Sequence, residues 1–209
     1  MSRESKIILM ELLILFFAIE IYIGFIRYGN PVFKKLFLLS MFAYMISSWI
    51  VRRDTLMDLG IKTGDWSGSK FVALMVIGNI ALMAIAGHIF NPDFGISSGF
   101  SFMLKLIWYT VWGTIQQMII QSYFTNRLLA AMPYPWQAIA ISGILFSFVH
   151  FPNPALSFIC LVNGLLSAYM FSKSRNIWLL GIGHAIIGSC VAEFLPWSWH
   201  HAMKIGPSF

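Results

Sequence analysis

Charged side chains are scarce in this sequence, which has 14 lysines and arginines and only eight aspartates and glutamates in 209 residues. Soluble domains carry roughly 25% charged residues, whereas this chain carries 11% and is 58% hydrophobic. Intrinsic disorder and nucleic-acid binding are therefore excluded, although the formal net charge is +6. The composition predicts an all-α, polytopic integral membrane helical bundle with about seven or eight transmembrane helices in a single domain, residues 1–209.

Cysteine is nearly absent as well. Cys160 and Cys190 lie inside apolar runs and do not have the spacing of a metal site. We interpret both as small buried hydrophobes, which excludes a disulfide scaffold. The first apolar run lacks a small-residue cleavage site, so we expect an anchor helix rather than a signal peptide.

Seven apolar runs are long enough, or nearly so, to cross a membrane, which takes about 20 residues. The fourth run is unusually long, so we expect it to tilt or to project from the membrane. We expect the tail Trp197–Phe209 to lie at the interface. The seven runs are Ile7–Ile26, Leu36–Val51, Phe71–Phe90, Phe100–Ala131, Trp136–Phe151, Ala155–Phe171 and Ile177–Leu195.

The distribution of lysine and arginine predicts the orientation. If the runs alternate in direction, nine of these residues fall on one side and five on the other, which places the amino terminus in the cytoplasm. We expect the charged connection Arg52–Lys70 to be interfacial or cytoplasmic. The nine are Arg3, Lys6, Arg52, Arg53, Lys62, Lys70, Arg127, Lys173 and Arg175, and the five are Arg27, Lys34, Lys35, Lys105 and Lys204.

Three glutamines lie close together in the fourth run, in the sequence Trp-Gly-Thr-Ile-Gln-Gln-Met-Ile-Ile-Gln. Polar side chains are costly in a bilayer, so they mark candidate functional sites. Gln117 and Gln121 are four residues apart and share a helix face, whereas Gln116 points about 100° away. Interhelical hydrogen bonding and a functional site both account for this cluster.

Two histidines lie in later runs. His150 precedes Pro152 and Pro154, where helix carbonyls lose their partners. His184 has glycines on both sides, including Gly183 and Gly188, which would let another helix approach and bury the imidazole. One such histidine is more often structural than catalytic, but two on different helices favour a shared site.

The order of these features resembles the CAAX-protease and bacteriocin-processing (CPBP, or Abi) family of intramembrane endopeptidases. That family has the motifs Glu-Glu-x-x-x-Arg, Phe-x-x-x-His, and His-x-x-x-Asn or Asp. Phe146 and His150 match the second motif, and His184 matches the start of the third. The resemblance covers about residues 100–194. It implies the family's helical fold and an endopeptidase that acts on a membrane-associated peptide or protein.

Two of the motifs depart from the family's pattern. Gln116 and Gln117 replace both glutamates, Gln121 replaces the arginine, and Gly188 stands where Asn or Asp is expected, with Ser189 beside it. In the family, the first glutamate is held to activate the attacking water, and the histidines to assist or to stabilise the oxyanion. An amide cannot take up a proton near neutral pH. We expect a hydrogen bond between Gln117 and Gln121 to replace the family's ion pair.

Other carboxylates are poor substitutes for the lost glutamates. Glu193 lies nine residues beyond His184, roughly 13 Å along a helix. Glu11 and Glu20 belong to the first run. We expect each of the three to reach the interface or to pair with a neighbouring helix.

Three functions remain open. The first is an intramembrane peptidase in which His150 is the general base or a water ligand, His184 is the oxyanion stabiliser or second ligand, and Gln116 and Gln117 orient water or substrate. The second is a catalytically inactive homologue that binds a membrane peptide or partner. The third is a haem protein with the two histidines as axial ligands.

The cofactor is left open by the sequence. His150 and His184 could hold a divalent metal together with a polar residue and water, but two histidines make an incomplete zinc site. The expected partners are the lipid bilayer and a membrane-associated peptide or protein, with no nucleic acid.

Overall fold

The computed structural model of the chain describes residues 2–61, 66–91, 93, 95 and 99–209, and within these residues every regular element is a helix. This confirms the predicted all-α class. Lys62, which contributes to the predicted orientation, lies outside the described residues, as does the rest of segment 62–65.

Five helical segments of the described chain are long and apolar enough to cross a membrane, so the protein is a multi-pass membrane protein. The fourth predicted run is one long helical stretch, in which α4 (Gly99–Gln117) continues through a π-helical segment (Met118–Thr125) into α5 (Asn126–Ala131). The helix α6 (Pro135–Phe148) is apolar but shorter. The five segments are α1 (Arg3–Gly24) with the following turn Ile26–Tyr28, α2 (Pro31–Val51), α3 (Ser69–Phe90), α7 (Pro154–Ser174) and α8 (Ile177–Phe194).

Asparagine caps decide where several helices begin. The helix α2 starts at Pro31 rather than at the predicted Leu36, because the Asn30 side chain accepts hydrogen bonds from the backbone N–H groups of Val32 and Phe33. The asparagines before α7 and α8 cap those helices in the same way. An asparagine just before an apolar run, followed by proline at α2 and α7, therefore marks the start of the helix, and a count of apolar residues does not detect it.

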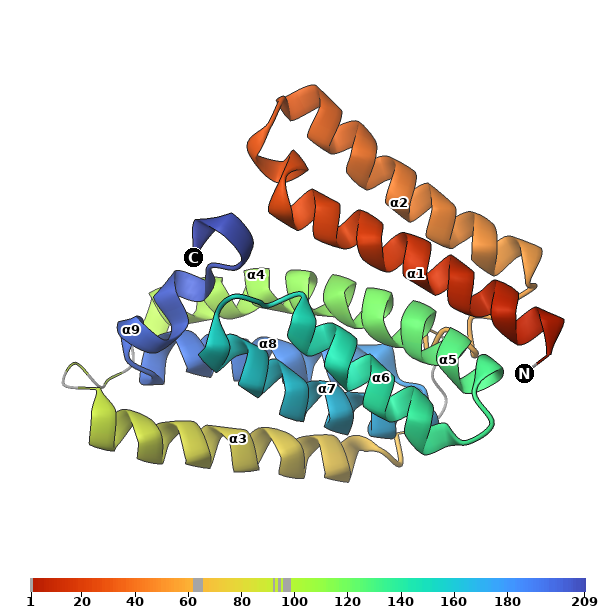
Figure 1. The fold of residues 1–209 in the computed structure, drawn as a ribbon. Helices are drawn as coiled ribbons and strands as arrows, with labels where there is room; N and C mark the ends of the chain where they lie inside the picture. Colours follow the sequence, from red (N-terminus) through yellow and green to blue (C-terminus); the bar gives the residue numbers. More distant parts are fainter. Residues whose placement is uncertain (1, 62–65, 92, 94, 96–98) are drawn as a thin grey trace.

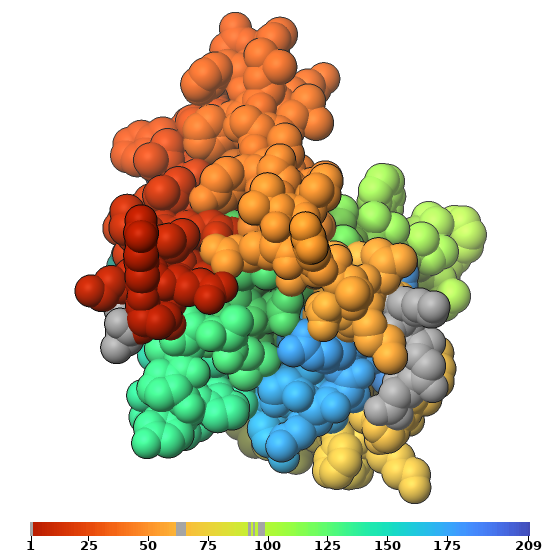
Figure 2. Space-filling view, turned by 90° about the vertical axis from the view of Figure 1, so that its right-hand side faces the viewer, coloured from red at the N-terminus to blue at the C-terminus, as the bar shows by residue number. Residues whose placement is uncertain are grey.

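The helices form two groups (Figure 1). In the larger group, α4 and α3 pack against α8, and α6 packs against α7. In the smaller group, α1 and α2 lie side by side, and α1 contacts α5. Figure 2 shows this hairpin rising from the rest of the molecule. The tail, with α9 (Trp197–His200), lies at the end of the bundle opposite the amino terminus.

Glycine lets α4 and α8 approach closely. A Cβ atom added at Gly113 of α4 would lie 2.8 Å from Cδ2 of His184, and one added at Gly188 of α8 would lie 2.7 Å from Cε1 of Tyr109. Real Cβ atoms do not tolerate such distances, because protein interiors are packed to the density of organic crystals. On the other side of α8, Gly183 faces Val72 of α3. The glycines around His184 thus fix its imidazole between neighbouring helices.

Candidate active site

A cavity of about 250 Å³ lies inside the larger helix group. Its wall is built from α4, α6, α7, α8 and the turn after α6. It brings together three predicted site residues that are far apart in the sequence, Gln116, His150 and His184. Phe146 and Gly188 line the same cavity.

His150 is oriented by a backbone carbonyl. The residue lies in the turn after α6, and its Nδ1 atom is 2.8 Å from the carbonyl oxygen of Phe146. A carbonyl oxygen can only accept, so Nδ1 carries the proton and donates it. In the neutral imidazole, Nε2 then has a free lone pair, which suits a general base.

His184 is oriented by an amide and has the opposite tautomer. The Nε2 atom of Gln117 lies 3.2 Å from Nδ1 of His184. An amide nitrogen can only donate, so we assign Nδ1 as the acceptor and place the imidazole proton on Nε2. His184 therefore has an N–H donor where His150 has an acceptor.

Phe146 holds the two histidines in place. Its ring centroid is 5.0 Å from the imidazole of His150 and 5.8 Å from that of His184, edge to face in both cases. This arrangement is favourable for aromatic rings and restricts the rotation of both imidazoles. The phenylalanine of the Phe-x-x-x-His motif therefore has a positioning role.

The three glutamines of the fourth run have different places. Gln116 lines the cavity, whereas Gln117 is buried behind His184 and Gln121 is buried with its Oε1 atom accepting a hydrogen bond from Thr125. The expected hydrogen bond between Gln117 and Gln121 is wrong, because Gln117 Oε1 and Gln121 Nε2 have no hydrogen-bond partner among the described residues. The π-helical segment begins at Met118, between the two, and its wider turn changes the α-helical i, i+4 register.

Of the neighbouring residues Gly188 and Ser189, only Gly188 lines the cavity. The ring of Tyr109 fills the space beside it where a longer side chain would lie. Ser189 is buried away from the cavity wall, and its hydroxyl has no hydrogen-bond partner among the described residues. Ser189 therefore does not substitute for the Asn or Asp of the family's third motif.

A second cavity, of about 210 Å³, joins the first to the α1–α2 hairpin. Its walls are mostly apolar, and it shares Gln116, Phe146 and His150 with the first cavity. The hairpin contributes Phe16 and Met41, so this second cavity is the space between the two helix groups. We call it the hairpin cavity.

Arg27 lines both cavities, which the sequence did not indicate. Its guanidinium donates hydrogen bonds to the carbonyl oxygen of Ile205 at 3.1 Å and to the Ser208 hydroxyl at 2.5 Å. The tail is fixed further by the N–H of Gly206, which donates to the carbonyl of Phe151 at 3.0 Å. The tail thus closes the cavity end next to His150.

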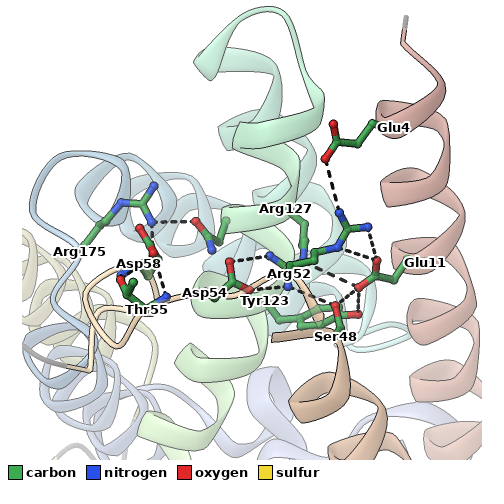
Figure 3. A network of polar contacts seen from close by, with 11 residues as sticks. Glu4, Glu11, Ser48, Arg52, Asp54, Thr55, Asp58, Tyr123, Arg127 and Arg175 are labelled. Atoms are coloured by element: carbon green, nitrogen blue, oxygen red, sulfur yellow. Dashed lines mark hydrogen bonds and ion pairs between the residues drawn. The ribbon is translucent and has the colours of Figure 1, made fainter. Parts of the chain in front are cut away.

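Two of the three glutamates considered as substitutes, Glu11 and Glu193, are paired away from the cavities. Glu11 accepts hydrogen bonds from Ser48, Tyr123 and Arg52 in a charged network at the amino-terminal end of the bundle (Figure 3). Glu193 forms an ion pair with Lys105 at 2.6 Å. Among the described residues, no carboxylate lines either cavity.

The residues of the cavity do not fit a zinc site. In the described part of the chain, no three His, Cys, Asp or Glu side chains are grouped to hold a metal ion, whereas a catalytic zinc takes three protein ligands.

Residues 99–190 match the family model of the Rce1-like type II CAAX prenyl endopeptidases. This confirms the resemblance to the CPBP family over the segment that contains all three motifs. No curated protein and no solved structure matches the chain.

Proposed function

We propose, on the basis of this family match, that the protein is a CAAX-protease-type endopeptidase of the membrane in which a histidine takes the role of the missing glutamate. The observation that supports it is the pair of imidazoles in one cavity, whose hydrogen-bond partners assign them opposite tautomers: a free Nε2 lone pair on His150 and an Nε2–H group on His184. A hydrolytic site needs both, a base for the water and a donor for the oxyanion.

The proposed reaction uses these groups in order. His150 Nε2 takes a proton from a water molecule held with Gln116, and the resulting hydroxide attacks the peptide carbonyl carbon. His184 Nε2–H donates to the oxygen that becomes negative. When the C–N bond breaks, the imidazolium of His150 returns its proton to the leaving amine, which restores the neutral site.

The substrate is a membrane-associated peptide or protein that reaches the site through the hairpin cavity. The apolar walls of this cavity suit a lipid-embedded segment, and its shared residues Gln116 and His150 lead directly to the catalytic groups. The nine-to-five excess of basic residues supports an orientation with the amino terminus in the cytoplasm.

A cleavage assay tests this function. The purified protein in nanodiscs is incubated with a farnesylated peptide that ends in a CAAX sequence, and the products are identified by mass spectrometry. We expect cleavage by the wild type and a loss of about 10²–10⁴-fold in His150→Ala. The rate should rise with pH as the imidazole that acts as the base loses its proton, and this rise should be absent in His150→Ala. His88→Ala, an exposed histidine of α3, is the matched control and should retain full activity.

An inactive binding relative is the second candidate, favoured by the lack of a carboxylate along the described walls of both cavities. In that case the wild type binds the peptide without cleaving it, and Gln116→Glu, which restores the family's residue, can produce turnover. Cleavage by the wild type that survives His150→Ala undiminished would contradict the proposed mechanism.

A further inference from the structure

Tyr109 of α4 is a polar residue of the cavity that the motifs do not include. Its ring lies against Gly188, one helical turn beyond His184 on α8, and any side chain at position 188 would collide with it. Tyr109 and Gln116 are seven residues apart, about two helical turns, so they lie on the same face of α4. Both line the cavity.

The hydroxyl of Tyr109 forms no hydrogen bond within the described part of the chain, although neighbouring polar groups of α4, such as Thr110 and Thr114, bond to their own helix. A phenol can both donate and accept. Tyr109 is half-buried and lines the cavity, so its hydroxyl is available to a partner that enters from outside.

The geometry points to Tyr109 as a second donor to the substrate carbonyl, which makes it a further catalytic residue; this inference rests on the proposed function. Oxyanion sites usually combine more than one donor, and His184 supplies a single N–H group. Tyr109 lines the same cavity beside Gly188, which lies one helical turn beyond His184 on α8. The hydroxyl keeps its proton throughout and donates a hydrogen bond to the oxygen as its negative charge develops.

Gly188 then contributes to the same oxyanion site by making room for Tyr109. Its lack of a side chain gives the tyrosine ring the room that it needs to line the cavity beside His184. Position 188 and position 109 thus act as a pair, in which a small residue on α8 is matched by a large polar one on α4.

The substitution Tyr109→Phe removes only the hydroxyl and leaves the ring against Gly188, so the fold should be retained. In the assay with the farnesylated CAAX peptide we expect kcat to fall by about 10²–10³-fold with little change in KM, the usual cost of one oxyanion donor. Tyr169→Phe is the matched control: Tyr169 lies on the exposed face of α7, away from both cavities, and its variant should match the wild type.

A binding measurement makes the test independent of turnover. The probe is the same farnesylated peptide with the scissile amide replaced by a phosphonamidate, whose anionic oxygen imitates the tetrahedral intermediate. We expect the wild type to bind this probe at least about 10²-fold more tightly than the amide peptide, and Tyr109→Phe to lose most of that preference.

The outcomes separate the two proposals. A wild type without any preference for the phosphonamidate, or a Tyr109→Phe variant with an unchanged preference, shows that the inference about Tyr109 is wrong. A wild type that prefers the phosphonamidate but cleaves nothing contradicts the proposed peptidase function, while loss of the preference in Tyr109→Phe still supports the hydroxyl as the donor.

Discussion

The two ends of the bundle treat buried polar groups in opposite ways. At the amino-terminal end, Arg127 lies 2.5 Å from Asp54, and Arg52 lies 2.8 Å from Glu11, so each charge has an opposite charge in contact (Figure 3). In the cavity near the other end, the glutamines and histidines are neutral, and the described residues place no carboxylate on its wall.

This difference accounts for the altered first motif. A buried charge is tolerated only with a partner, and removing one member of a buried pair is far more costly than removing both. In this chain the glutamates and the arginine of the family's motif are all replaced by glutamine, so no unpaired charge is left at positions 116, 117 and 121. Arg127, six residues beyond Gln121, is a buried cation, but it is paired with Asp54 in the charged network.

Three of the basic residues counted for the orientation also hold the fold together. Arg52 and Arg127 pair with Glu11 and Asp54, and Arg175 donates to the Asp58 carbonyl and to Asn126. Their bonds hold α1 and the connection after α2 against α5 and the connection between α7 and α8.

The largest effect is expected from breaking the charged network. Arg127→Ala leaves Asp54 without its 2.5 Å partner and weakens the contact with Ser48, at a position where the arginine side chain is only 4% exposed. We expect the free energy of unfolding to fall by about 3–5 kcal/mol, measured by thermal or denaturant unfolding in detergent micelles.

Arg53→Ala is the control for this experiment. Arg53 belongs to the same connection but is exposed, so its loss should change the unfolding free energy by about 0.5 kcal/mol or less. If Arg127→Ala is no more destabilising than Arg53→Ala, the network does not hold the two helix groups together.

A smaller loss of unfolding free energy is expected when a buried hydrogen bond beside the cavity is removed. Gln117 is as deeply buried as Arg127, but Gln117→Leu removes one neutral hydrogen bond, to Nδ1 of His184, and leaves no charge unpaired. We expect a loss of about 1 kcal/mol in unfolding free energy. Turnover should fall as well, since the His184 tautomer is no longer fixed. A loss as large as that of Arg127→Ala would contradict the interpretation that Gln117 and His184 form a neutral pair.

Much of the fold could be predicted from the sequence. Apolar run lengths alone located every long helix, because a membrane-spanning helix must bury about 20 residues in lipid. Their ends were less accurate where an asparagine cap extends the helix, as Asn30 does for α2. The π-helical segment at Met118–Thr125 could not be predicted, since it depends on packing against several neighbouring helices rather than on a local pattern.

For the candidate site, the motifs located Gln116, His150 and His184, because polar groups in apolar runs are conspicuous. Tyr109 and Arg27 were missed. Tyrosine is common in membrane helices, and only its spacing of seven residues from Gln116 could have singled it out. Arg27 reaches the cavity through the tail, a long-range contact with no local signal.

The smallest effect is expected from the pH dependence of the charged end. The hydroxyl of Thr55 donates to the Asp58 carboxylate at 2.6 Å and the backbone N–H of Thr55 at 2.9 Å, and these bonds, with Arg175 nearby, lower the pKa of Asp58 below its ordinary value. Because the pKa is lower in the folded state, the stabilisation is complete above the unfolded value of about 3.9 and is lost as the pH falls through the folded value. Asp58→Asn should therefore be less stable than the wild type by up to about 1 kcal/mol near pH 6, and the difference should shrink towards pH 3. Unfolding of both proteins in detergent across this pH range measures it. A difference that stays constant down to pH 3 would mean that the carboxylate acts through its shape rather than its charge, and an amide of the kind found in the cavity would then serve as well at the charged end.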